Sequence, residues 1–173
     1  MFPFPQYHKE ILGTFEVVSG NLVVSDPCYE EDLDILKKAK KGTWEAIVVK
    51  KIELGLYRVV SGIVAKHVDA SDPIMLEETK PARFGVHVDS GQAGIFDAAH
   101  YQDDSVIESF DPRFSFENPW YNKCCELTCS LHAAGILPYG AVSSSGNGDG
   151  TYQCRYRRDE SGEIDYVRIE FLK

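Results

Sequence analysis

Three copies of a Ser-Gly-amide turn constrain the fold more than any other pattern in the chain. Each copy lies beside a short apolar run, and glycine flanked by serine and an amide side chain is typical of a tight turn between strands. The copies are Ser19-Gly20-Asn21, Ser90-Gly91-Gln92 and Ser145-Gly146-Asn147. An aspartate follows each one, at Asp26, Asp97 and Asp149, with the same spacing in the first two copies. We therefore expect a chain built from strand–turn–strand units.

The first two copies predict a larger unit of strand, tight turn, strand and Asp-capped helix. We expect this unit near residues 15–41 and again near 84–108, as a pseudo-repeat within a single domain that spans residues 1–173. Two aspartates at equivalent helix starts would then frame one cleft. The alternative is that short turn words recur by chance.

Strand signals account for most of the remaining pattern. Runs rich in valine and isoleucine predict strands at residues 15–18, 22–25, 43–51, 54–67, 84–88 and 93–96. The first two are expected to pair across Ser19-Gly20-Asn21, and the last two across Ser90-Gly91-Gln92. Near the C-terminus, polar and apolar residues alternate on both sides of a turn at 159–163, which predicts another hairpin with its arginines on a solvated face.

The first predicted helix follows Asp26. Asp26 would be its N-cap and Pro27 its first residue, while acidic residues crowd the first turns and the lysines of 37–41 crowd the last. Gly42 would end it. Tyr29, Leu33 and Leu36 would form its apolar stripe.

A second helix is expected to start at Asn118-Pro119 and to end just before Gly135. Its buried stripe would consist of Trp120, Cys124, Leu127, Leu131 and Ala134. A short helical turn also fits the long connection at 69–82. The predicted fold is therefore α+β, a single domain with a mainly antiparallel β-sheet and two or three packed helices.

Composition narrows the class of partner and the compartment. The chain has 18 Lys and Arg against 27 Asp and Glu, a formal charge of −9, whereas a nucleic-acid surface needs clustered positive charge. No apolar run approaches the roughly 18 residues of a membrane helix, and no signal-peptide pattern is present. Five irregularly spaced cysteines indicate reduced thiols. We expect a cytoplasmic protein that binds neither nucleic acid nor membrane, with its oligomeric state left open.

Cys28 is the sharpest catalytic candidate. As the second residue of the predicted helix, its thiol would lie near the positive end of the helix dipole, which lowers a thiol pKa. His87 or His100 could act as the base, with Asp89 or Asp97 to orient it. Nearby carboxylates would raise the pKa again, and no cysteine-hydrolase signature surrounds this residue. Structural packing is therefore the reading that we favour for Cys28.

The ligand-binding candidates are mostly acidic and lie in or close to the Ser-Gly-amide turns. They are Asp26, Asp89, Gln92, Asp97 and Asp149. Asp26, Asp89, Asp97 and Asp149 could together hold a hard cation through oxygen ligands. Each also has a capping or turn role that needs no ligand, so no metal or other cofactor is predicted.

Two further motifs have a structural reading that we favour. Cys125, Cys129 and His132 would share one helical face, but zinc needs a fourth ligand, and the helix must bury an apolar face in any case. The glycine-rich stretch 146–150 leads into a strand and lacks the lysine of a phosphate-binding loop. Its glycines could still give a small ligand or peptide close access to the backbone.

Three words in the chain carry a resemblance to a known family. They are Asp26-Pro27-Cys28-Tyr29, Val88-Asp89-Ser90-Gly91-Gln92, and the stretch 144–152, which fits the pattern SSGxGDGxY. With these words the chain resembles a family of uncharacterised bacterial and phage-associated proteins, a domain of unknown function. Asn147 stands where an aromatic residue is expected from the resemblance, so a stacking role at this position is not implied. The resemblance points to residues of interest and implies no activity.

Two hypotheses about function follow. The first is a non-enzymatic cytosolic binding protein that engages a partner protein or a small ligand, such as an immunity or anti-defence factor. The second is a hydrolase-like enzyme that uses Cys28 with a histidine base, or a metal held by Asp26, Asp97 and Asp149. We favour the first, because the sequence contains no complete catalytic constellation.

Overall fold

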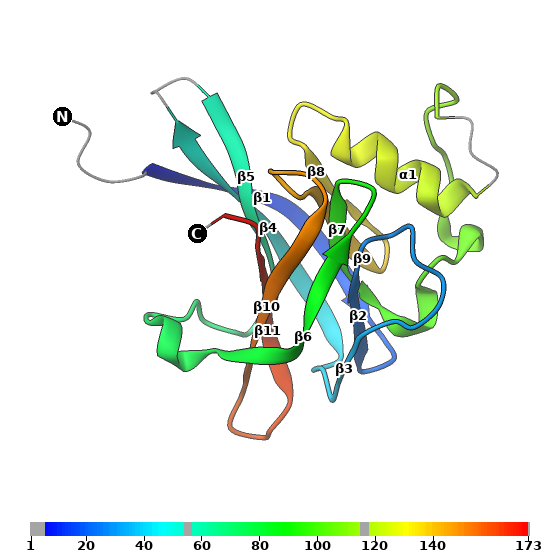
Figure 1. The fold of residues 1–173 in the computed structure, drawn as a ribbon. Coiled ribbons are helices and arrows are strands. Elements are labelled where there is room, and N and C mark those ends of the chain that lie inside the picture. Colours follow the sequence, from blue (N-terminus) through cyan, green and yellow to red (C-terminus); the bar gives the residue numbers. More distant parts are fainter. Residues whose placement is uncertain (1–5, 54–56, 115–117, 173) are drawn as a thin grey trace.

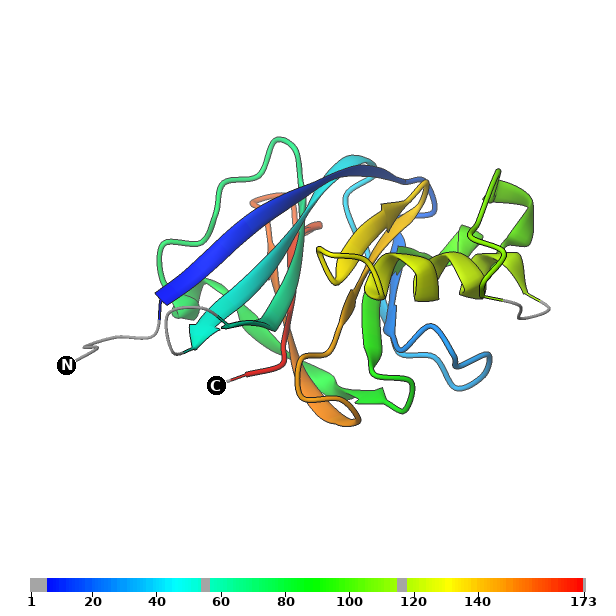
Figure 2. The ribbon, with the colours of Figure 1, turned by 90° about the horizontal axis from the view of Figure 1, so that it is seen from above.

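Two antiparallel β-sheets make up most of the protein in the computed structural model, which describes residues 6–53, 57–114 and 118–172 (Figure 1). The first sheet contains, in spatial order, β1 (Gln6–Val17), β4 (Gly42–Glu53), β5 (Tyr57–His67), β11 (Ile164–Glu170), β10 (Gly150–Arg158) and β6 (Lys80–Val88). The second contains β3 (Ile35–Lys37), β2 (Asn21–Ser25), β7 (Gln92–Asp97), β9 (Gly140–Ser144) and β8 (Ala134–Leu137). The sheets face each other across the core, and α1 (Pro119–Thr128) lies on the outside of the second sheet (Figure 2).

The main core lies between the two sheets. Inward-facing residues alternate with outward-facing ones along each strand, so one face of each sheet contributes to it. Trp44 and Ile169 come from the first sheet and Leu22 and Ile95 from the second, and all four side chains are fully buried. A smaller cluster under α1 contains Phe96, Trp120, Cys124, Leu137 and Val142.

The predicted α+β fold with two or three packed helices is wrong, because the described residues contain one α-helix and three short 3-10 helices. The latter are η1 (Leu76–Glu78), η2 (Ala98–His100) and η3 (Asp104–Val106). The helix expected after Asp26 is absent, and its residues form a turn and the short strand β3. The backbone φ is positive at Asp32 and Lys38, which no α-helix allows. Pairing of β3 with β2 therefore overrides a weak local helix pattern.

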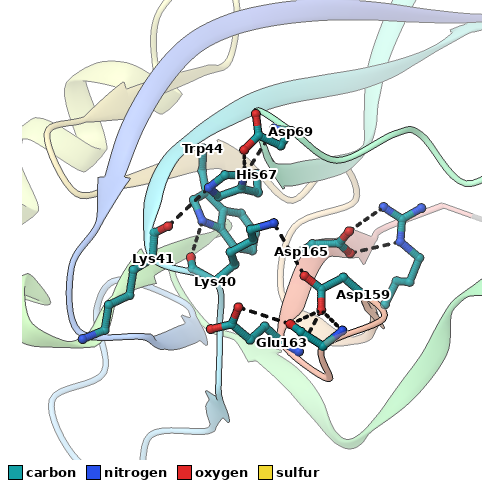
Figure 3. Close-up of polar contacts among 10 residues, drawn as sticks. Lys40, Lys41, Trp44, His67, Asp69, Asp159, Glu163 and Asp165 are labelled. Atoms are coloured by element: carbon teal, nitrogen blue, oxygen red, sulfur yellow. Dashed lines mark hydrogen bonds and ion pairs between the residues drawn. The ribbon is translucent and has the colours of Figure 1, made fainter.

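The lysine run consequently extends from the end of β3 into the β3–β4 connection and does not mark a helix end. This connection is bound to the β10–β11 hairpin, since the Lys40 N–H donates to the Ile164 carbonyl and the Ile164 N–H to the Lys38 carbonyl. Figure 3 shows the side chains at this junction. Trp44 Nε1 donates to the Lys40 carbonyl at 2.8 Å, and Lys40 Nζ lies 3.6 Å from Asp159 Oδ2.

Helix α1 begins as predicted but ends early. Asn118 caps it by accepting from the Tyr121 N–H at 2.9 Å, and Pro119 is its first residue. It stops at Thr128, and Ala134 and Gly135 belong to β8 instead. Leu131, expected in the buried stripe, is 96% exposed. Among the described residues, no helix is long and apolar enough to cross a membrane.

The Ser-Gly-amide turns mark three of the four places where the described chain passes from one sheet to the other, and the fourth is the β3–β4 connection. The first connects β1 to β2, the second β6 to β7, and the third leads from β9 to β10. The hairpins expected across the first two turns are therefore wrong, because β1 pairs with β4, and β2 pairs with β3 and β7. Each turn needs its glycine, with φ of +75° at Gly20, +69° at Gly91 and +71° at Gly146. The C-terminal hairpin of β10 and β11 is confirmed.

The strand order reads alike from both ends of the first sheet. From one edge it runs β1, β4, β5, and from the other β6, β10, β11, with β5 and β11 paired at the centre. Phe15 on β1 pairs with Trp44, which packs edge-on against His67. Val86 on β6 pairs with Tyr152, which packs edge-on against Phe171. A duplicated strand–turn–strand unit would produce this pattern, so the pseudo-repeat stays a prediction, now without its helix.

Glu10 ties the edge strand β1 to its surroundings. Its Oε2 accepts hydrogen bonds from Lys50 Nζ at 3.0 Å and pairs with His132 Nδ1 at 3.1 Å. The Lys50 side chain is only 7% exposed. Burial alone would raise the pKa of Glu10, but the hydrogen bonds and charges of Lys50 and His132 outweigh burial, and the pKa is lowered.

We predict that Glu10→Gln lowers the free energy of unfolding by about 1–3 kcal/mol at pH 7, because the buried Lys50 amine loses its charged partner. A carboxyl with a lowered folded-state pKa stabilises the protein above its unfolded pKa, and this stability is lost as the pH falls through the folded value. The difference between Glu10→Gln and the parent chain should therefore shrink between about pH 5 and pH 3. Denaturant titrations at several pH values measure it. Glu160→Gln, at an exposed turn residue, is the control. A difference independent of pH would contradict this prediction.

Candidate functional site

The Asp26 carboxylate joins two segments that are distant in the sequence. It is fully buried at the end of β2. Its Oδ2 accepts from the N–H groups of Asp89 and Ser90 at 2.8 and 2.7 Å, while Oδ1 accepts from Ser90 Oγ at 2.6 Å and from the Cys28 N–H at 2.9 Å. These four bonds hold the turn between β6 and β7 against the start of the loop that follows β2.

Asp97 does the same at the crossing from β1 to β2. It is also fully buried, at the end of β7. Its Oδ1 accepts from the N–H groups of Val18 and Ser19 at 3.0 and 2.9 Å and from Ser19 Oγ at 2.7 Å. Its Oδ2 accepts from the Ala99 N–H at 3.2 Å and so caps η2. Because β2 and β7 pair antiparallel, Asp26 at the end of β2 binds the turn that leads into β7. In the same way, Asp97 at the end of β7 binds the turn that leads into β2.

The loop after Asp26 is held from two sides. Tyr101 Oη donates to the carbonyls of Asp26 and Tyr29 at 3.1 and 2.8 Å. Gln102 Nε2 donates to the carbonyls of Pro27 and Tyr29 at 3.1 and 2.9 Å. The Tyr29 hydroxyl in turn donates to the Asp89 carboxylate. The loop therefore has a defined conformation beside the Ser90 turn.

A groove of about 440 Å³ opens beside this junction. The Ser90–Gln92 turn forms one wall and the exposed side of α1 the other, with these lining residues: Ser90, Gly91, Gln92, Phe114, Tyr121, Cys125, Thr128, Cys129 and Ser144. We call it the α1 groove. Gln92 organises its floor, because its Nε2 donates to Ser90 Oγ at 3.3 Å and to Cys125 Sγ at 3.5 Å, while its Oε1 accepts from Thr128 Oγ1 at 2.9 Å.

The groove disfavours negative charge on its own side chains. Burial raises the pKa of Tyr121 to about 12, and the charge of Asp26 adds to this effect against a hydrogen bond with Ser90 that lowers it. Burial likewise raises the pKa of Cys125, although hydrogen bonds with Gln92 and Tyr121 act in the opposite direction. Both groups are therefore neutral at physiological pH, and the negative charge of Asp26 raises the pKa of both.

Cys28 lies next to this junction, but its surroundings disfavour a thiolate. Although the residue counts as exposed, partial burial of its sulfur is the largest cause that raises its pKa, to about 12. The hydrogen bond with Asp26 and the charges of Asp26 and Asp89 raise it further. The helix dipole that was expected to lower this pKa is absent, because no helix begins here.

The candidate histidines lie elsewhere. His87 Nδ1 contacts Thr151 Oγ1 at 2.9 Å, and His100 Nδ1 contacts Asp103 Oδ2 at 2.9 Å while its ring stacks on Tyr139. Neither has a hydrogen bond to Cys28 in the described part of the chain. These contacts argue against a Cys28–histidine pair.

The acidic candidates do not form one cluster. Asp26 and Asp89 lie together, Asp97 serves the other crossing, and Asp149 is exposed at the start of β10. Among the residues that the structure describes, no group of three or more His, Cys, Asp or Glu side chains is placed to hold a metal ion. The face expected for Cys125, Cys129 and His132 is broken, because α1 ends before His132, which pairs with Glu10.

The residues beside one wall of the groove were predicted from the sequence, and most of those on the other wall were not. Asp26, Asp89 and Gln92 were singled out by their turn words. Tyr121 and Thr128 were not, although they and Cys125 stand at helical spacing on a face of α1 next to its buried stripe. A polar stripe of this kind is a signal only when another element is known to face it.

We predict that Asp26→Asn lowers the free energy of unfolding by about 2–4 kcal/mol, because an amide nitrogen replaces one acceptor that the buried N–H and hydroxyl donors require. Denaturant titration measures the effect. Asp149→Asn makes the same chemical change at an exposed position and should shift stability by less than about 0.5 kcal/mol. Equal effects of the two substitutions would show that the buried hydrogen bonds of Asp26 contribute nothing to stability.

We also predict that Cys28 reacts slowly with iodoacetamide at neutral pH, because the thiolate is the reactive form. In a Cys129→Ser background, which removes the other exposed thiol, the alkylation rate should rise about tenfold per pH unit up to pH 10 without a plateau. Adding Asp26→Asn should speed the reaction, since it removes the nearest negative charge. A plateau below pH 9 in the parent background would restore Cys28 as a candidate nucleophile.

Comparison with known proteins adds a family and no activity. A family model described as "Protein of unknown function (DUF4241)" matches residues 15–169, which extend from the end of β1 to the end of β11. No curated protein and no solved structure matches the chain. The match agrees with the expected domain of unknown function. The three motif words and the bacterial or phage origin stay predictions.

Proposed function

The chain belongs to the DUF4241 family, and we propose that it is a non-enzymatic binding protein whose α1 groove takes a neutral or positively charged, hydrogen-bonding segment of a partner. The observation that carries the proposal is the arrangement of Gln92. Its amide is buried and bonded to Ser90, Cys125 and Thr128, so it holds the two walls of the groove in one arrangement. Preformed sites of this kind bind with a small loss of conformational entropy.

The negative charges near the groove favour a partner segment that is neutral or positively charged. The Asp26 carboxylate lies one hydrogen bond behind Ser90, and Asp89 is next to it in the sequence. A carboxylate or phosphate in the groove would meet this negative potential, whereas a lysine or arginine side chain would be attracted to it. The overall charge of −9 acts in the same direction and would also speed the encounter with a basic partner.

The chemistry of the groove favours binding over catalysis. Its thiol and phenol have raised pKa values, so neither is an activated nucleophile at neutral pH. The Cys28 thiol also has a raised pKa, while His87 and His100 bond to Thr151 and Asp103, so the cysteine version of the enzyme hypothesis lacks a thiolate and an adjacent base. If the partner belongs to a toxin or defence system, binding would make the chain an immunity or anti-defence factor.

The test uses three capped amino-acid amides that differ in charge: N-acetyl-lysine, N-acetyl-glutamine and N-acetyl-glutamate methylamides. We predict that the lysine and glutamine probes shift the ¹⁵N–¹H signals of Ser90, Gly91 and Thr128 in a titration of the labelled chain. The glutamate probe should bind at least about tenfold more weakly, a difference of about 1.4 kcal/mol, because of repulsion by Asp26.

Gln92→Ala should weaken binding of the glutamine probe by about three- to tenfold, because it removes the hydrogen bonds that hold Ser90 and Thr128 in position. Gln153→Ala, at an exposed position on β10, is the matched control and should leave binding unchanged. Thr128→Val removes one hydrogen bond to Gln92 and provides a second variant if Gln92→Ala unfolds the chain. Equal affinity for all three probes, or shifts spread over both sheets, would overturn the proposal.

A further inference from the structure

A second concave surface lies on the outer face of the first sheet, away from the second sheet and from α1. The β5–β6 connection passes beside this face (Figure 2). Two cavities of about 210 and 320 Å³ share four lining residues there, Lys9, Asp72, Tyr166 and Arg168. Because they share these residues, the two cavities form one continuous cleft, which we call the outer cleft.

The floor of the outer cleft is apolar. It consists of Ile47 and Val49 on β4, Val64 on β5 and Tyr166 on β11, all at most 7% exposed. Their sequence neighbours Val48, Ala65 and Val167 belong to the main core. The central strands of the first sheet are therefore apolar on both faces, although only one of these faces is covered by the second sheet.

Positive groups line this apolar floor. Among the described residues, Lys9 makes no ion pair. The Arg168 side chain is 33% exposed, and its Nε lies 3.3 Å from Glu170 Oε1. The acidic residue of the cleft, Asp72, is already neutralised by Lys66 at 3.2 Å. Arg168 and Asp72 therefore each have a charged partner, and Lys9 is the group in this apolar cleft that a bound anion could pair with, in a chain of charge −9.

We propose that the outer cleft binds a small amphipathic carboxylate, with its aromatic or branched aliphatic body on the floor of Ile47, Val49 and Val64 and its carboxylate between Lys9 and Arg168. The size of the cleft favours a small molecule, because ligand pockets of about 300–1,000 Å³ are typical for such compounds. Apolar lining with a few orienting polar groups is the usual composition of these pockets. A bound carboxylate would give Lys9 the charged partner that it lacks among the described residues.

This site is independent of the α1 groove and prefers the opposite charge. The experiment compares naphthalene-2-carboxylate with naphthalene-2-carboxamide, which has the same ring system without the charge. We expect the carboxylate to bind at least tenfold more tightly in calorimetric titrations at low salt, and to shift the ¹⁵N–¹H signals of residues 47, 49 and 166. Raising the salt concentration should narrow the difference.

Lys9→Gln and Arg168→Gln should each weaken binding of the carboxylate about three- to tenfold and leave binding of the carboxamide unchanged. Lys37→Gln and Arg83→Gln change exposed residues on β3 and β6 and are the matched controls. Lys9 is exposed, so its variant keeps the test valid if Arg168→Gln disturbs folding. Gln92→Ala in the α1 groove should have no effect, which separates this proposal from the proposed function.

Equal binding of the acid and the amide, or acid binding that neither variant weakens, would overturn the proposal. An acidic apolar peptide, N-acetyl-Leu-Glu-Leu-Glu-amide, tests the alternative occupant. If it binds in the outer cleft more tightly than the small acid, the cleft is a polypeptide docking site, and the small-molecule assignment is wrong.

Discussion

Two buried carboxylates, Asp26 and Asp97, each pair backbone N–H groups at a place where the chain passes from the first sheet to the second. A strand that leaves its sheet exposes N–H groups that no neighbouring strand can satisfy. Asp26 accepts from two such groups at the β6–β7 crossing, and Asp97 from two at the β1–β2 crossing. Charge-assisted hydrogen bonds are stronger than neutral ones, which explains why aspartate occupies both positions.

The same interaction creates the α1 groove and sets its electrostatics. Asp26 fixes Ser90, Ser90 accepts from Gln92, and Gln92 connects to α1 through Cys125 and Thr128. A buried charge that the architecture requires thus lies directly behind a surface with polar groups. Any ligand there meets a negative potential whose removal would also weaken the crossing. Asp26 therefore both stabilises the fold and sets the charge preference of the α1 groove.

Local sequence predicted the elements better than their pairing. The glycine turns, most strands and the start of α1 are readable because each depends on neighbouring residues. Ser19-Gly20-Asn21 supports a hairpin and a crossing equally well, and the choice depends on β4 and β7, which lie far along the chain. The acidic and lysine residues after Asp26 fit a helix, yet they are exposed side chains that tolerate a turn and a short strand. The pairing of β3 with β2 decided that segment.

The site residues, like the strands and turns, were predictable from the sequence only where they depend on neighbouring residues. Asp26, Asp89 and Gln92 were found because their function begins with the local turn, whereas Cys28 was interpreted through a helix that does not form. The outer cleft had a detectable signal, since Ile47, Val48 and Val49 are consecutive and a half-buried strand would alternate. Such a run implies cover on both faces. One cover is the second sheet, while the other face carries Lys9 and Arg168 over an apolar floor, and a bound anion with an apolar body would satisfy both requirements.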